Sequence, residues 1–534
     1  MSFVPDTQNK EFQDALNLIQ YTRQSVFLTG KAGTGKSTFL KYICTNTKKK
    51  HVVLAPTGIA AINAGGSTLH SFFKLPFYPL LPDDPNFSLQ RGRIHEFFKY
   101  TKPHRKLLEE LELVIIDEIS MVRADIIDAV DRILRVYSRN LREPFGGKQI
   151  LLVGDVFQLE PVVKGDEREI LNRFYPTPYF FSARVFGQID LVSIELQKVY
   201  RQTDSKFIHV LDHIRNNTVG STELQLLNTR YGTQIEQSEA DMYITLATRR
   251  DNVDYINDKK LAELPGDPVT FYGEIMGDFP ESSLPTSQEL VLKPGAQIIF
   301  IKNDFDRRWV NGTIGVISGF DPIEETLYVI TDDGKECDVK RESWRNIRYK
   351  YNEEKKQIEE EELGTFTQYP VRLAWAITVH KSQGLTFSRV VIDFTGGVFA
   401  GGQAYVALSR CTSLEGIQLK KPISRADVFV RPEIVSFSER FNNRTAIDRA
   451  LKQAQADVQY VAAAKAFDKG DFGTFLDEFF KAIHSRYDIE KPNVQRLIRR
   501  KLNIINRLKE ENRALKQAAL EKEKALVKYA REYI

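Results

Sequence analysis

The stretch SVFLTGKAGTGKSTFLKYI, residues 25–43, decides the first half of the fold. It starts as an apolar run typical of a buried strand, passes through a glycine-rich turn and ends as a helix-like segment. Inside it, Gly30 to Ser37 matches the pattern GxxxxGK[ST] in full. Glycines let consecutive backbone N–H groups point at a phosphate, and the N-terminus of the next helix adds partial positive charge. The stretch therefore predicts a strand–loop–helix unit that binds a nucleoside triphosphate.

Two side chains of this loop carry the predicted phosphate chemistry. Lys36 is expected to reach the β- and γ-phosphates, and the hydroxyl of Ser37 is expected to ligate Mg²⁺. The other predicted nucleotide contacts in the loop are Gly33, Thr34, Gly35 and Thr38.

Four further apolar runs, at 51–56, 113–118, 149–155 and 191–196, predict strands of a parallel sheet that is covered on both faces. Ligands of such sheets bind at the carboxyl ends of the strands, where Asp117 and Glu118 fall. Asp117 is expected to hold Mg²⁺, and Glu118 to polarise the attacking water. Carboxylates also end strands for ordinary reasons, but the phosphate loop favours the catalytic interpretation.

The bulk composition limits the class of protein. With 534 residues, 42% hydrophobic and 27% charged, the chain predicts several globular domains. The net charge of only +4 means that a polyanion must be bound in a local basic groove. The three cysteines are far apart and predict neither disulfides nor a zinc site. No apolar run approaches the roughly 20 residues needed to cross a bilayer, and the start lacks the features of a signal or transit peptide. We expect a cytoplasmic, bacterial-type protein without a membrane partner.

Seven segments tie the phosphate loop to the rest of the chain. In order, they are FLTGKAGTGKST (27–38), APTGIAAINAGGSTLHSFF (55–73), VIIDEISMV (114–122), LVGDVFQLEPV (152–162), ELQKVYRQ (195–202), VHKSQGLTF (379–387) and YVALSRC (405–411). They resemble motifs I, Ia, II, III, IV, V and VI of superfamily 1 helicases. The combination of GTGKST, IDEISM, GDxxQLxPV and HKSQG is similar to the PIF (petite integration frequency) helicases of superfamily 1B, with RecD-like helicases next nearest. The last hundred or so residues lie outside the resemblance.

The resemblance implies further nucleotide contacts. Gln158 is expected to sense the γ-phosphate, and Arg201 and Arg410 are expected to clamp it from the second motor domain, because guanidinium groups can bind phosphate oxygens bidentately. Gln383 and Gly384 are expected where motif V meets the nucleotide.

The family contacts adenine with a glutamine shortly before the phosphate loop, and two residues compete for this role. Gln13 has about the right spacing, whereas Asn9 fits the local pattern better, so both are candidates.

The resemblance also implies a nucleic-acid track. Small hydroxyls and backbone N–H groups of motif Ia could hold phosphates without reading sequence, although helix capping by Thr57 and Ser67 is an equally good explanation. Pro161 is expected to support a base, and the loop after 377 is expected to report the ATP state to the DNA. The candidate nucleic-acid residues are Thr57, Gly58, Ser67, Thr68, His70, Pro161, Thr378, His380 and Lys381.

The expected fold is α/β, with two RecA-like parallel-sheet motor domains, two small insertions and a helical C-terminal extension. NG, SG and DG turns between short β-rich runs predict a small antiparallel module, which resembles the SH3-like insertion of the family. An aromatic and proline-rich segment lies where the family carries its strand-separating wedge, and Phe77 and Tyr78 in it could stack on bases or equally be packing residues. The expected bounds are 1–190 for domain 1A, 74–106 for the 1B wedge, 191–295 and 369–430 for domain 2A, 296–368 for the SH3-like 2B insertion, and 431–534 for the helical extension.

The helical extension ends in a long element that begins at Pro492 and carries apolar residues at 3–4 spacing. An amphipathic hairpin packed on the motor is the simpler interpretation. A coiled-coil or partner-docking arm is the alternative, for which Asn512 on the stripe would set the register.

The implied activity is ATP- and Mg²⁺-dependent 5′-to-3′ translocation on single-stranded DNA and unwinding of forked or structured duplexes, including G-quadruplexes. Two alternatives are open. One is a nucleic-acid-stimulated ATPase that acts as a scaffold or subunit and recruits a nuclease or repair partner. The other is an RNA helicase, since these motifs mainly contact the backbone. We expect a monomer or weak oligomer whose C-terminal helices are candidates for docking a protein.

Overall fold

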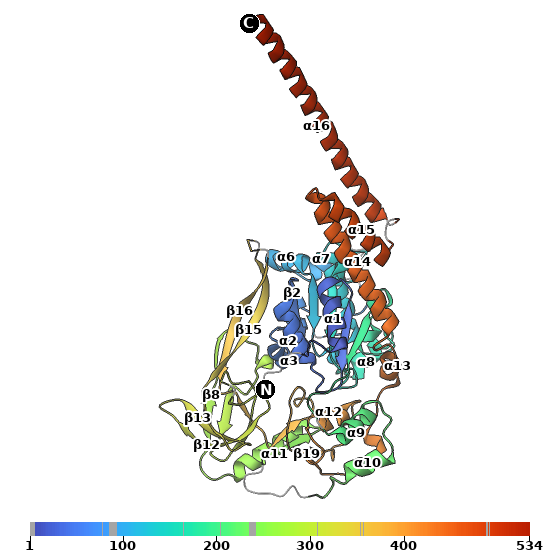
Figure 1. The fold of residues 1–534 in the computed structure, drawn as a ribbon. Coiled ribbons are helices and arrows are strands. Elements are labelled where there is room, and N and C mark those ends of the chain that lie inside the picture. Colours follow the sequence, from blue (N-terminus) through green and yellow to red (C-terminus); the bar gives the residue numbers. More distant parts are fainter. Residues whose placement is uncertain are drawn as a thin grey trace. The chain divides into compact units, whose positions relative to one another are not determined.

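The computed structural model describes residues 6–76, 78–84, 93–163, 165–202, 204–233, 242–306, 308–352, 354–355, 357–487, 490 and 492–533. The chain divides into two compact units, residues 1–447 and 448–534 (Figure 1).

The first unit begins with a six-stranded parallel sheet in the order β3-β2-β4-β5-β1-β6. Its strands are β1 (Val26–Gly30), β2 (His51–Ala55), β3 (Ser67–Thr68), β4 (Leu113–Ile116), β5 (Gln149–Val153) and β6 (Val192–Leu196). The α-helices of this part are α1 (Lys10–Tyr21), α2 (Lys36–Asn46), α3 (Gly58–Ala64), α4 (Leu69–Phe73), α5 (Ile94–Phe97), α6 (Lys102–Glu110), α7 (Ala124–Tyr137) and α8 (Gly165–Leu171). Short 3-10 turns are η2 (Ile119–Met121), η3 (Pro144–Gly147), η4 (Phe180–Ser182) and η5 (Arg184–Gly187). Strands β1, β4 and β5 are buried throughout, as expected for a sheet with both faces covered.

A second parallel sheet of four strands follows in the order β18-β7-β19-β20. Its strands are β7 (Ile244–Ala247), β18 (Ala376–Thr378), β19 (Val390–Asp393) and β20 (Ile417–Leu419). The helices of this part are α9 (Ser205–Arg215), α10 (Ser221–Asn228), α11 (Arg250–Glu263), α12 (Gln403–Leu408) and α13 (Pro432–Ser438), with the 3-10 turn η7 (Arg425–Asp427). Two parallel sheets in one chain confirm the predicted α/β class with two motor-type cores.

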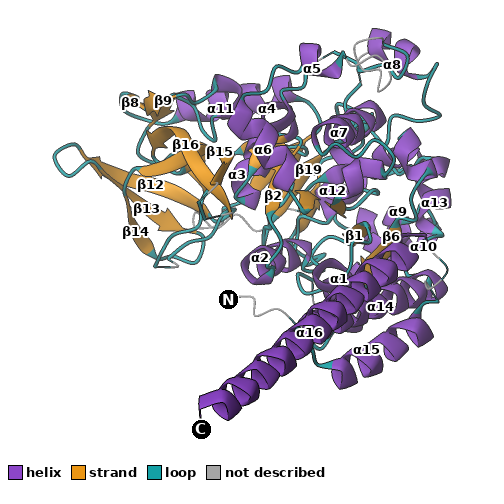
Figure 2. Cartoon of the chain, turned by 90° about the horizontal axis from the view of Figure 1, so that it is seen from above, coloured by secondary structure: helices purple, strands orange, loops and turns teal. Residues whose placement is uncertain are grey.

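An antiparallel β module lies beside the two parallel sheets (Figures 1 and 2). Its five-stranded sheet has the order β14-β13-β12-β11-β17, a three-stranded sheet has the order β15-β16-β9, and β10 pairs with β8. The strands are β8 (Val269–Tyr272), β9 (Glu274–Gly277), β10 (Glu289–Leu292), β11 (Gln297–Phe300), β12 (Ile314–Asp321), β13 (Thr326–Thr331), β14 (Glu336–Val339), β15 (Glu342–Asn352), β16 (Gln357–Gln368) and β17 (Val371–Leu373), with the turn η6 (Glu281–Ser283). The module has its own core, in which the rings of Phe300 and Trp309 stack with centroids 4.4 Å apart.

The apolar run 371–377 serves two sheets. Val371–Leu373 pairs antiparallel with β11, and only Ala376–Thr378 joins the parallel sheet beside β7. β18 is buried throughout, whereas only Val371 is buried in β17. The run is mostly apolar in sequence, so composition alone could not show that the chain passes from one sheet to another within it.

The strands also differ from two expected domain bounds. β6 starts at Val192, beyond the bound at 190, yet it pairs with β1 and belongs to the first sheet. The antiparallel pairing begins at Val269 rather than at 296, since β8 pairs with β10 and β9 pairs with β16.

The hairpin of β15 and β16 reaches the first sheet. The Tyr349 hydroxyl lies 3.3 Å from the backbone nitrogen of Val53 in β2, and the Tyr349 ring packs edge-on against Phe72 with centroids 6.0 Å apart. Residues 354–355 lie at the turn and residues 357–363 lie along β16, where Glu361 pairs with Arg348 at 2.9 Å. The hairpin therefore joins the β module to helix α4 and strand β2.

The predicted wedge segment is partly described. Tyr78 is 52% exposed, whereas Tyr100 is buried and its hydroxyl donates to the carbonyl of Phe73 at 2.5 Å. Phe77, a second candidate for stacking on a base, lies outside the described residues. Tyr100 is thus a packing residue, and Tyr78 is available at the surface.

The second unit is helical, as expected. Its helices are α14 (Arg444–Asp468, which starts in the first unit), α15 (Phe472–Ser485) and α16 (Pro492–Tyr533). Gly470 has φ of 79° and separates α14 from α15, as its position in the sequence indicated. Beyond Asn506, the described side chains of α16 are exposed, including Leu508, Leu515 and Leu526. Among the described residues, every helix is too short or too polar to span a membrane.

Candidate functional site

The phosphate loop lies between β1 and α2 and depends on glycine. Gly33 and Gly35 have φ of 82° and 90°, in the region that L-residues rarely occupy. A Cβ on Gly33 would also lie 2.4 Å from the Cβ of Arg201. The Lys36 Nζ donates to the carbonyls of Gly30 at 2.7 Å and Lys31 at 3.0 Å, so the lysine is held inside the loop. Burial lowers the pKa of Lys36, which means that a nearby anion would be strongly favoured.

The two predicted carboxylates follow β4 directly. Burial raises the pKa of Asp117 and Glu118, and their proximity raises that of Asp117 further. Glu118 has φ of 49°, which is a strained conformation for a residue with a side chain. The backbone nitrogen of Asp117 is held 2.8 Å from the Leu54 carbonyl of the neighbouring strand. Raised pKa values and local strain in the same turn are typical of a functional site.

The two predicted glutamines meet across the two sheets. The Gln383 Nε2 lies 3.5 Å from the Gln158 Oε1, although 225 residues separate them. Gly402, at the start of α12, allows that helix to lie close to the loop that carries Gln158. It has φ of 76°, and a Cβ there would lie 2.3 Å from the Phe157 carbonyl and 2.4 Å from the Gln158 carbonyl. Sequence reasoning did not single out Gly402, because a lone glycine carries no signal of what approaches it.

The two predicted arginines also meet at this site. Arg410 is fully buried, and its guanidinium donates to the carbonyls of Val406 at 3.0 Å and Ser382 at 3.4 Å. Arg201 lies 3.3 Å from the Ser409 carbonyl, and burial, helped by Arg410, lowers the pKa of Arg201 to about 9. Arg410 belongs to the second-sheet part, as expected. Arg201 instead follows β6 of the first sheet, where the neighbouring Tyr200 donates from its backbone nitrogen to the Gly33 carbonyl at 2.8 Å.

Electrostatic coupling shows that these residues share one site. The pKa of Lys36 responds to Glu118 and Arg201, and that of Glu118 responds to Lys36 and Arg410. The structure thus gathers predicted residues from motifs I, II, IV and VI around the phosphate loop. Ser37, Thr34 and Thr38 lie in the same loop and the first turn of α2, where Ser37 is exposed.

Sequence reasoning missed a buried ion pair beside the loop. Arg215 of α9 lies 3.1 Å from Asp155 and 2.8 Å from Glu195, and it is 3% exposed. Lys31 pairs with Asp212 of the same helix at 2.6 Å. Nothing in the spacing of Arg215 distinguishes it from the other basic residues of the chain.

Tyr405 was quoted within a motif but given no role. Its hydroxyl accepts from the Ala32 backbone nitrogen at 2.9 Å, so α12 contacts the phosphate loop itself. Gln202 was likewise quoted within a motif without a role. Its Nε2 donates to the carbonyls of Ser409 and Cys411 at 3.1 Å each.

The two candidates for adenine differ in what they bind. The Asn9 side chain caps α1 by accepting from the Phe12 nitrogen at 2.9 Å, and Gln13 is exposed and donates to the Thr7 carbonyl at 2.8 Å. The Asn9 oxygen and the Gln13 amide nitrogen are thus each engaged locally, and both residues stay candidates for the adenine contact.

The candidates from motif Ia lie at the ends of β2 and β3. Thr57 caps α3 and Thr68 caps α4, each accepting a backbone N–H at 3.2 and 3.1 Å. Ser67 is buried in β3 and caps neither helix. Gly58 is packed closely, since a Cβ there would lie 2.7 Å from the Ser283 Oγ of the β module. His70 is half-buried, and burial lowers its pKa.

The candidates from the second sheet form a separate group after β18. The Thr378 Oγ1 accepts from the Lys381 backbone nitrogen at 3.2 Å and so shapes the turn. Burial lowers the pKa of His380 and of Lys381, and the charges of Arg372 and Arg250 lower that of Lys381 further. Near the first sheet, Pro161 is buried while its neighbour Val162 is 70% exposed. Val162 is therefore better placed than Pro161 to contact a base.

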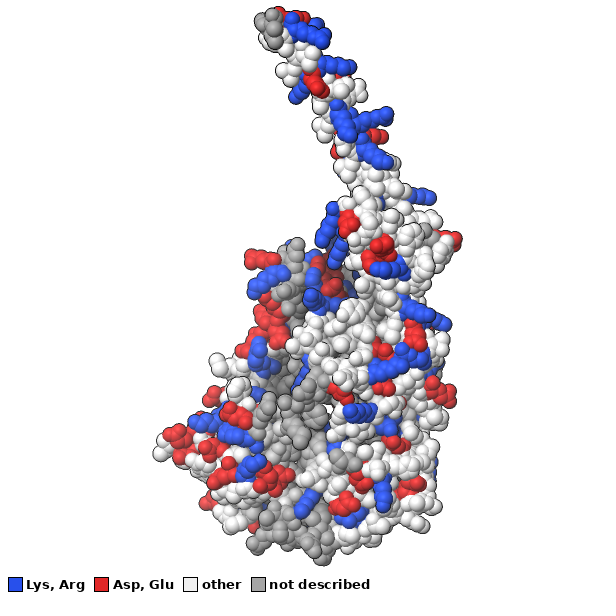
Figure 3. All heavy atoms as spheres, in the orientation of Figure 1, with Lys and Arg blue, Asp and Glu red and all other residues white. Residues whose placement is uncertain are grey.

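On the face shown in Figure 3, lysine and arginine are interspersed with acidic side chains rather than gathered in one patch. This mixture agrees with the net charge of only +4. Arg372 and Arg250 lie near Lys381 and form a local group of positive charges with it.

A profile of the PIF1-like helicase family matches residues 4–225. The ATP-dependent DNA helicase PIF1 of Homo sapiens is 33% identical over 415 residues, which cover 74% of this chain and 58% of the human protein. The chain thus spans less than two thirds of that relative's length. The ATP-dependent DNA helicase Pif1 of Bdellovibrio bacteriovorus is 31% identical over 439 residues, which cover 81% of this chain and 91% of the relative.

Solved structures of Pif1 from Bacteroides extend the likeness to three dimensions. The complex with ADP-AlF4 is 42% identical, has a TM-score of 0.74, and covers 80% of this chain and 96% of the other. The form bound to ssDNA is 41% identical and has a TM-score of 0.58, with 82% and 97% covered. The family expected from the motifs is thereby confirmed: this chain is a member of the PIF1-like helicases.

Proposed function

We propose that this protein is an ATP-dependent DNA helicase that moves 5′ to 3′ along single-stranded DNA. One observation carries the proposal: the phosphate loop of the first sheet meets the second part, since the Ala32 backbone nitrogen donates to the Tyr405 hydroxyl of α12 at 2.9 Å and the Arg410 charge acts on Glu118. A nucleotide held between two sheets couples its hydrolysis to their relative movement. The loop that holds Arg410 through the Ser382 carbonyl also carries Thr378 and Lys381, the candidate contacts to DNA.

Each residue of the site then has a stated task. Lys36 exchanges the carbonyls of Gly30 and Lys31 for the β- and γ-phosphate oxygens of ATP. Glu118 accepts the proton of the attacking water. The guanidinium groups of Arg201 and Arg410 stabilise the charge that develops on the transferred phosphoryl group.

The donor set also fits Mg²⁺. Asp117 and the exposed hydroxyl of Ser37 are oxygen ligands of the kind that Mg²⁺ prefers, and a bound cation would favour the charged forms of the neighbouring carboxyls of Asp117 and Glu118. When bound, Mg²⁺ neutralises charge between the β- and γ-phosphates. Gln158 and Gln383 meet where the γ-phosphate is expected and would transmit its presence from one sheet to the other.

The proposed substrates are single-stranded DNA and forked duplex, with G-quadruplexes as a further structured substrate. Support comes from the Bacteroides relative, which has been solved bound to ssDNA. Thr57, Gly58, Thr68 and His70 would contact the strand on the first sheet, and Thr378, His380 and Lys381 on the second. Such a protein would act at the nucleoid of a bacterial cell. We assign 1A to the first sheet, 2A to the second, 2B to the antiparallel module and 1B to the segment with Tyr78.

Unwinding of tailed duplexes tests the activity. The purified protein is incubated with ATP and Mg²⁺ on duplexes with a 5′ tail, a 3′ tail or no tail, and Lys36→Ala serves as the inactive control. We expect unwinding of the 5′-tailed duplex alone. ATP hydrolysis stimulated by DNA without unwinding on any tail would instead indicate a scaffold ATPase, and equal unwinding on an RNA tail would remove the preference for DNA.

For the exposed end of α16 we propose docking to a second copy of the same helix. Ile505, Leu508, Asn512, Leu515 and Leu526 follow heptad spacing, and in a parallel pair Asn512 would face its counterpart. Glu511 of one copy would then lie near Lys516 of the other, a favourable pair. An antiparallel pair would bury Asn512 against leucine.

Sedimentation velocity measures this association. Leu515→Glu should abolish any concentration-dependent dimer, while Leu520→Glu, at an exposed position off the stripe, should leave it unchanged. A protein that stays monomeric at all concentrations would refute docking to a second copy.

A further inference from the structure

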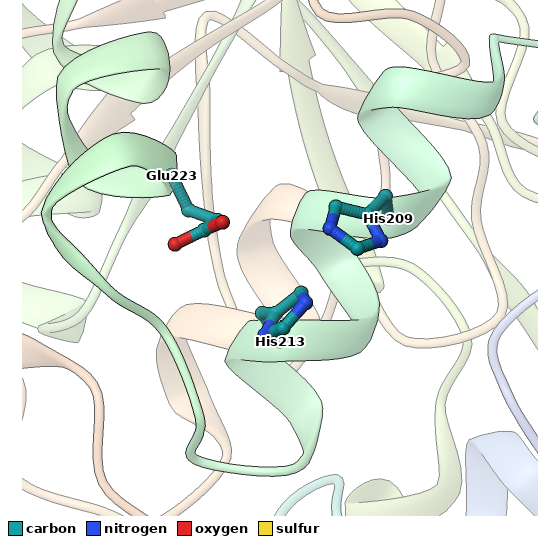
Figure 4. Close-up of side chains that lie close together, drawn as sticks. All are labelled: His209, His213 and Glu223. Atoms are coloured by element: carbon teal, nitrogen blue, oxygen red, sulfur yellow. The ribbon is translucent and has the colours of Figure 1, made fainter.

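Three potential metal ligands meet on the surface of the second-sheet part. They are His209 and His213 on α9 and Glu223 on α10, and their ligand atoms all lie within 4.8 Å of one another. Figure 4 shows the two imidazole rings on successive turns of α9 with the carboxylate facing them from α10. His209 is exposed and the other two are half-buried, so the cluster is open to solvent.

The loop between the two helices already orients two of these ligands. The His213 Nδ1 lies 2.9 Å from the Thr218 Oγ1 and 3.2 Å from the Thr218 carbonyl. In the tautomer that carries its proton on Nδ1, both oxygens can accept that proton and the Nε2 lone pair is free. Ligating histidines in metal sites commonly donate their other ring N–H to a backbone carbonyl in this way.

Glu223 is held similarly. Its Oε2 accepts from the Gly220 backbone nitrogen at 2.8 Å, which leaves Oε1 free to bind. Gly220 is the N-cap of α10, and this hydrogen bond from the N-cap backbone to the third helical residue fixes the carboxylate at the first turn of that helix. Hydrogen-bonded carboxylates of this kind are the usual metal ligands beside histidine.

We propose that His209, His213 and Glu223 bind a divalent transition-metal ion, with zinc(II) as the favoured metal. Two imidazole nitrogens and one carboxylate oxygen are an established ligand set for Zn²⁺, with a water in the fourth position. Zn–N bonds of about 2.0–2.1 Å place tetrahedral ligands about 3.4 Å apart, which small side-chain rotations would achieve from the present positions. The expectation of no zinc site rested on the cysteines, and this site uses none.

The metal would act as a clip between α9 and α10. Arg215 lies two residues beyond His213, about 200° around the helix, and there it pairs with Asp155 of the first sheet. A bound ion would fix the end of α9 and hence the position of Arg215. The bound ion would therefore stabilise the pair of helices α9 and α10, whether or not a nucleotide is bound.

Metal titration of the full chain, purified without a polyhistidine tag and freed of metal by chelator, tests the site. Co²⁺ serves as the spectroscopic probe, because a protein-bound low-coordinate ion gives visible absorption bands that Zn²⁺ then abolishes by displacement. We expect one Co²⁺ per chain, no competition from excess Mg²⁺, and a rise in the thermal midpoint with Zn²⁺.

Matched variants assign the ligands. His213→Gln and Glu223→Gln should each weaken binding by about tenfold or more, and Glu223→Gln keeps an oxygen for the cap to Gly220. His484→Gln is the control. The His484 Nδ1 also lies 3.0 Å from a backbone carbonyl, but among the described residues His484 belongs to no group of potential metal ligands. Each variant must match the wild-type thermal midpoint in chelator, which excludes misfolding.

Two results would overturn the proposal: no stoichiometric binding of Co²⁺ or Zn²⁺, or binding that the His213 and Glu223 variants leave unchanged. Cys44→Ser is measured in parallel, since Cys44 is the most accessible thiol of the three. If that variant alone lost the metal, the ion would belong to the thiol and the proposed site would be wrong.

Discussion

The guanidinium of Arg215 lies 3.1 Å from the carboxylate of Asp155 and joins helix α9 to the loop after β5. The same guanidinium lies 2.8 Å from Glu195 at the end of β6 and 4.3 Å from the centroid of the Phe157 ring. One buried cation therefore neutralises two carboxylates at the nucleotide end of the first sheet. It also ties that end to the second-sheet part.

Arg215→Ala should destabilise the protein strongly. Removing one partner of a buried ion pair costs about 3–5 kcal/mol, because Asp155 and Glu195 would be left buried without a counter-charge. Thermal unfolding measures the loss, and ATP hydrolysis should fall with it. Arg507→Ala is the control, since Arg507 is 71% exposed on α16 and its loss should cost little. Equal midpoints for the two variants would contradict the assigned role of Arg215.

Gln383→Ala should separate hydrolysis from movement. Its amide approaches Gln158 across the two sheets at 3.5 Å, while its neighbours Thr378 and Lys381 are the candidate DNA contacts. We expect fewer base pairs unwound per ATP hydrolysed, with a smaller change in the Kd for single-stranded DNA. The double variant with Gln158→Ala should be no worse than either single variant. Unchanged unwinding per ATP would rule out this role for the loop.

Gly402→Ala tests the close approach of α12 to the loop after β5. The new Cβ would lie 2.3 Å from the Phe157 carbonyl, and the left-handed backbone adds about 1–2 kcal/mol. We expect a large loss of ATP hydrolysis, because the two sheets could not close as they do here. Gly470→Ala is matched in φ, at 79°, but has nothing within 4 Å, so it should show only the backbone cost. Similar losses in both variants would mean that the contact is unimportant.

Binding of Mg²⁺-nucleotide should weaken as the pH falls. Burial raises the pKa of Asp117 and Glu118 in the nucleotide-free protein, so the carboxyls hold protons at a higher pH than usual and must release them to bind the cation. Affinity is therefore present above the raised pKa values and lost as the pH falls through them. Calorimetry in buffers of different ionisation enthalpy should detect proton release on binding. The Asp117→Asn variant should release fewer protons on binding than the wild type. Equal release by the two proteins would contradict the assignment of Asp117 to the Mg²⁺ site.

The same carboxyls affect folding with the opposite sign. Their pKa values are higher in the folded than in the unfolded state, so the folded nucleotide-free protein binds more protons. Their contribution to stability is greatest at low pH and is lost as the pH rises through the folded pKa values. Binding of Mg²⁺-nucleotide should remove this loss of stability at higher pH.

The sequence by itself determined the local units of the site. The pattern from Gly30 to Ser37 specifies a loop with left-handed glycines and a helix start, and the apolar run before Asp117 specifies a strand that delivers the carboxylate to the sheet edge. These features depend on residues close in the chain. Backbone preferences and burial periodicity therefore make them readable without the tertiary structure.

Only the tertiary structure decided which distant residues meet. The contact of Tyr405 with Ala32 joins residues 373 positions apart, and Arg215 finds Asp155 and Glu195 only because α9 lies against the first sheet. The run 371–377 likewise serves two sheets, since each of its short strands is apolar enough for either. Such pairings follow from how whole layers pack together. No spacing along the chain encodes that packing.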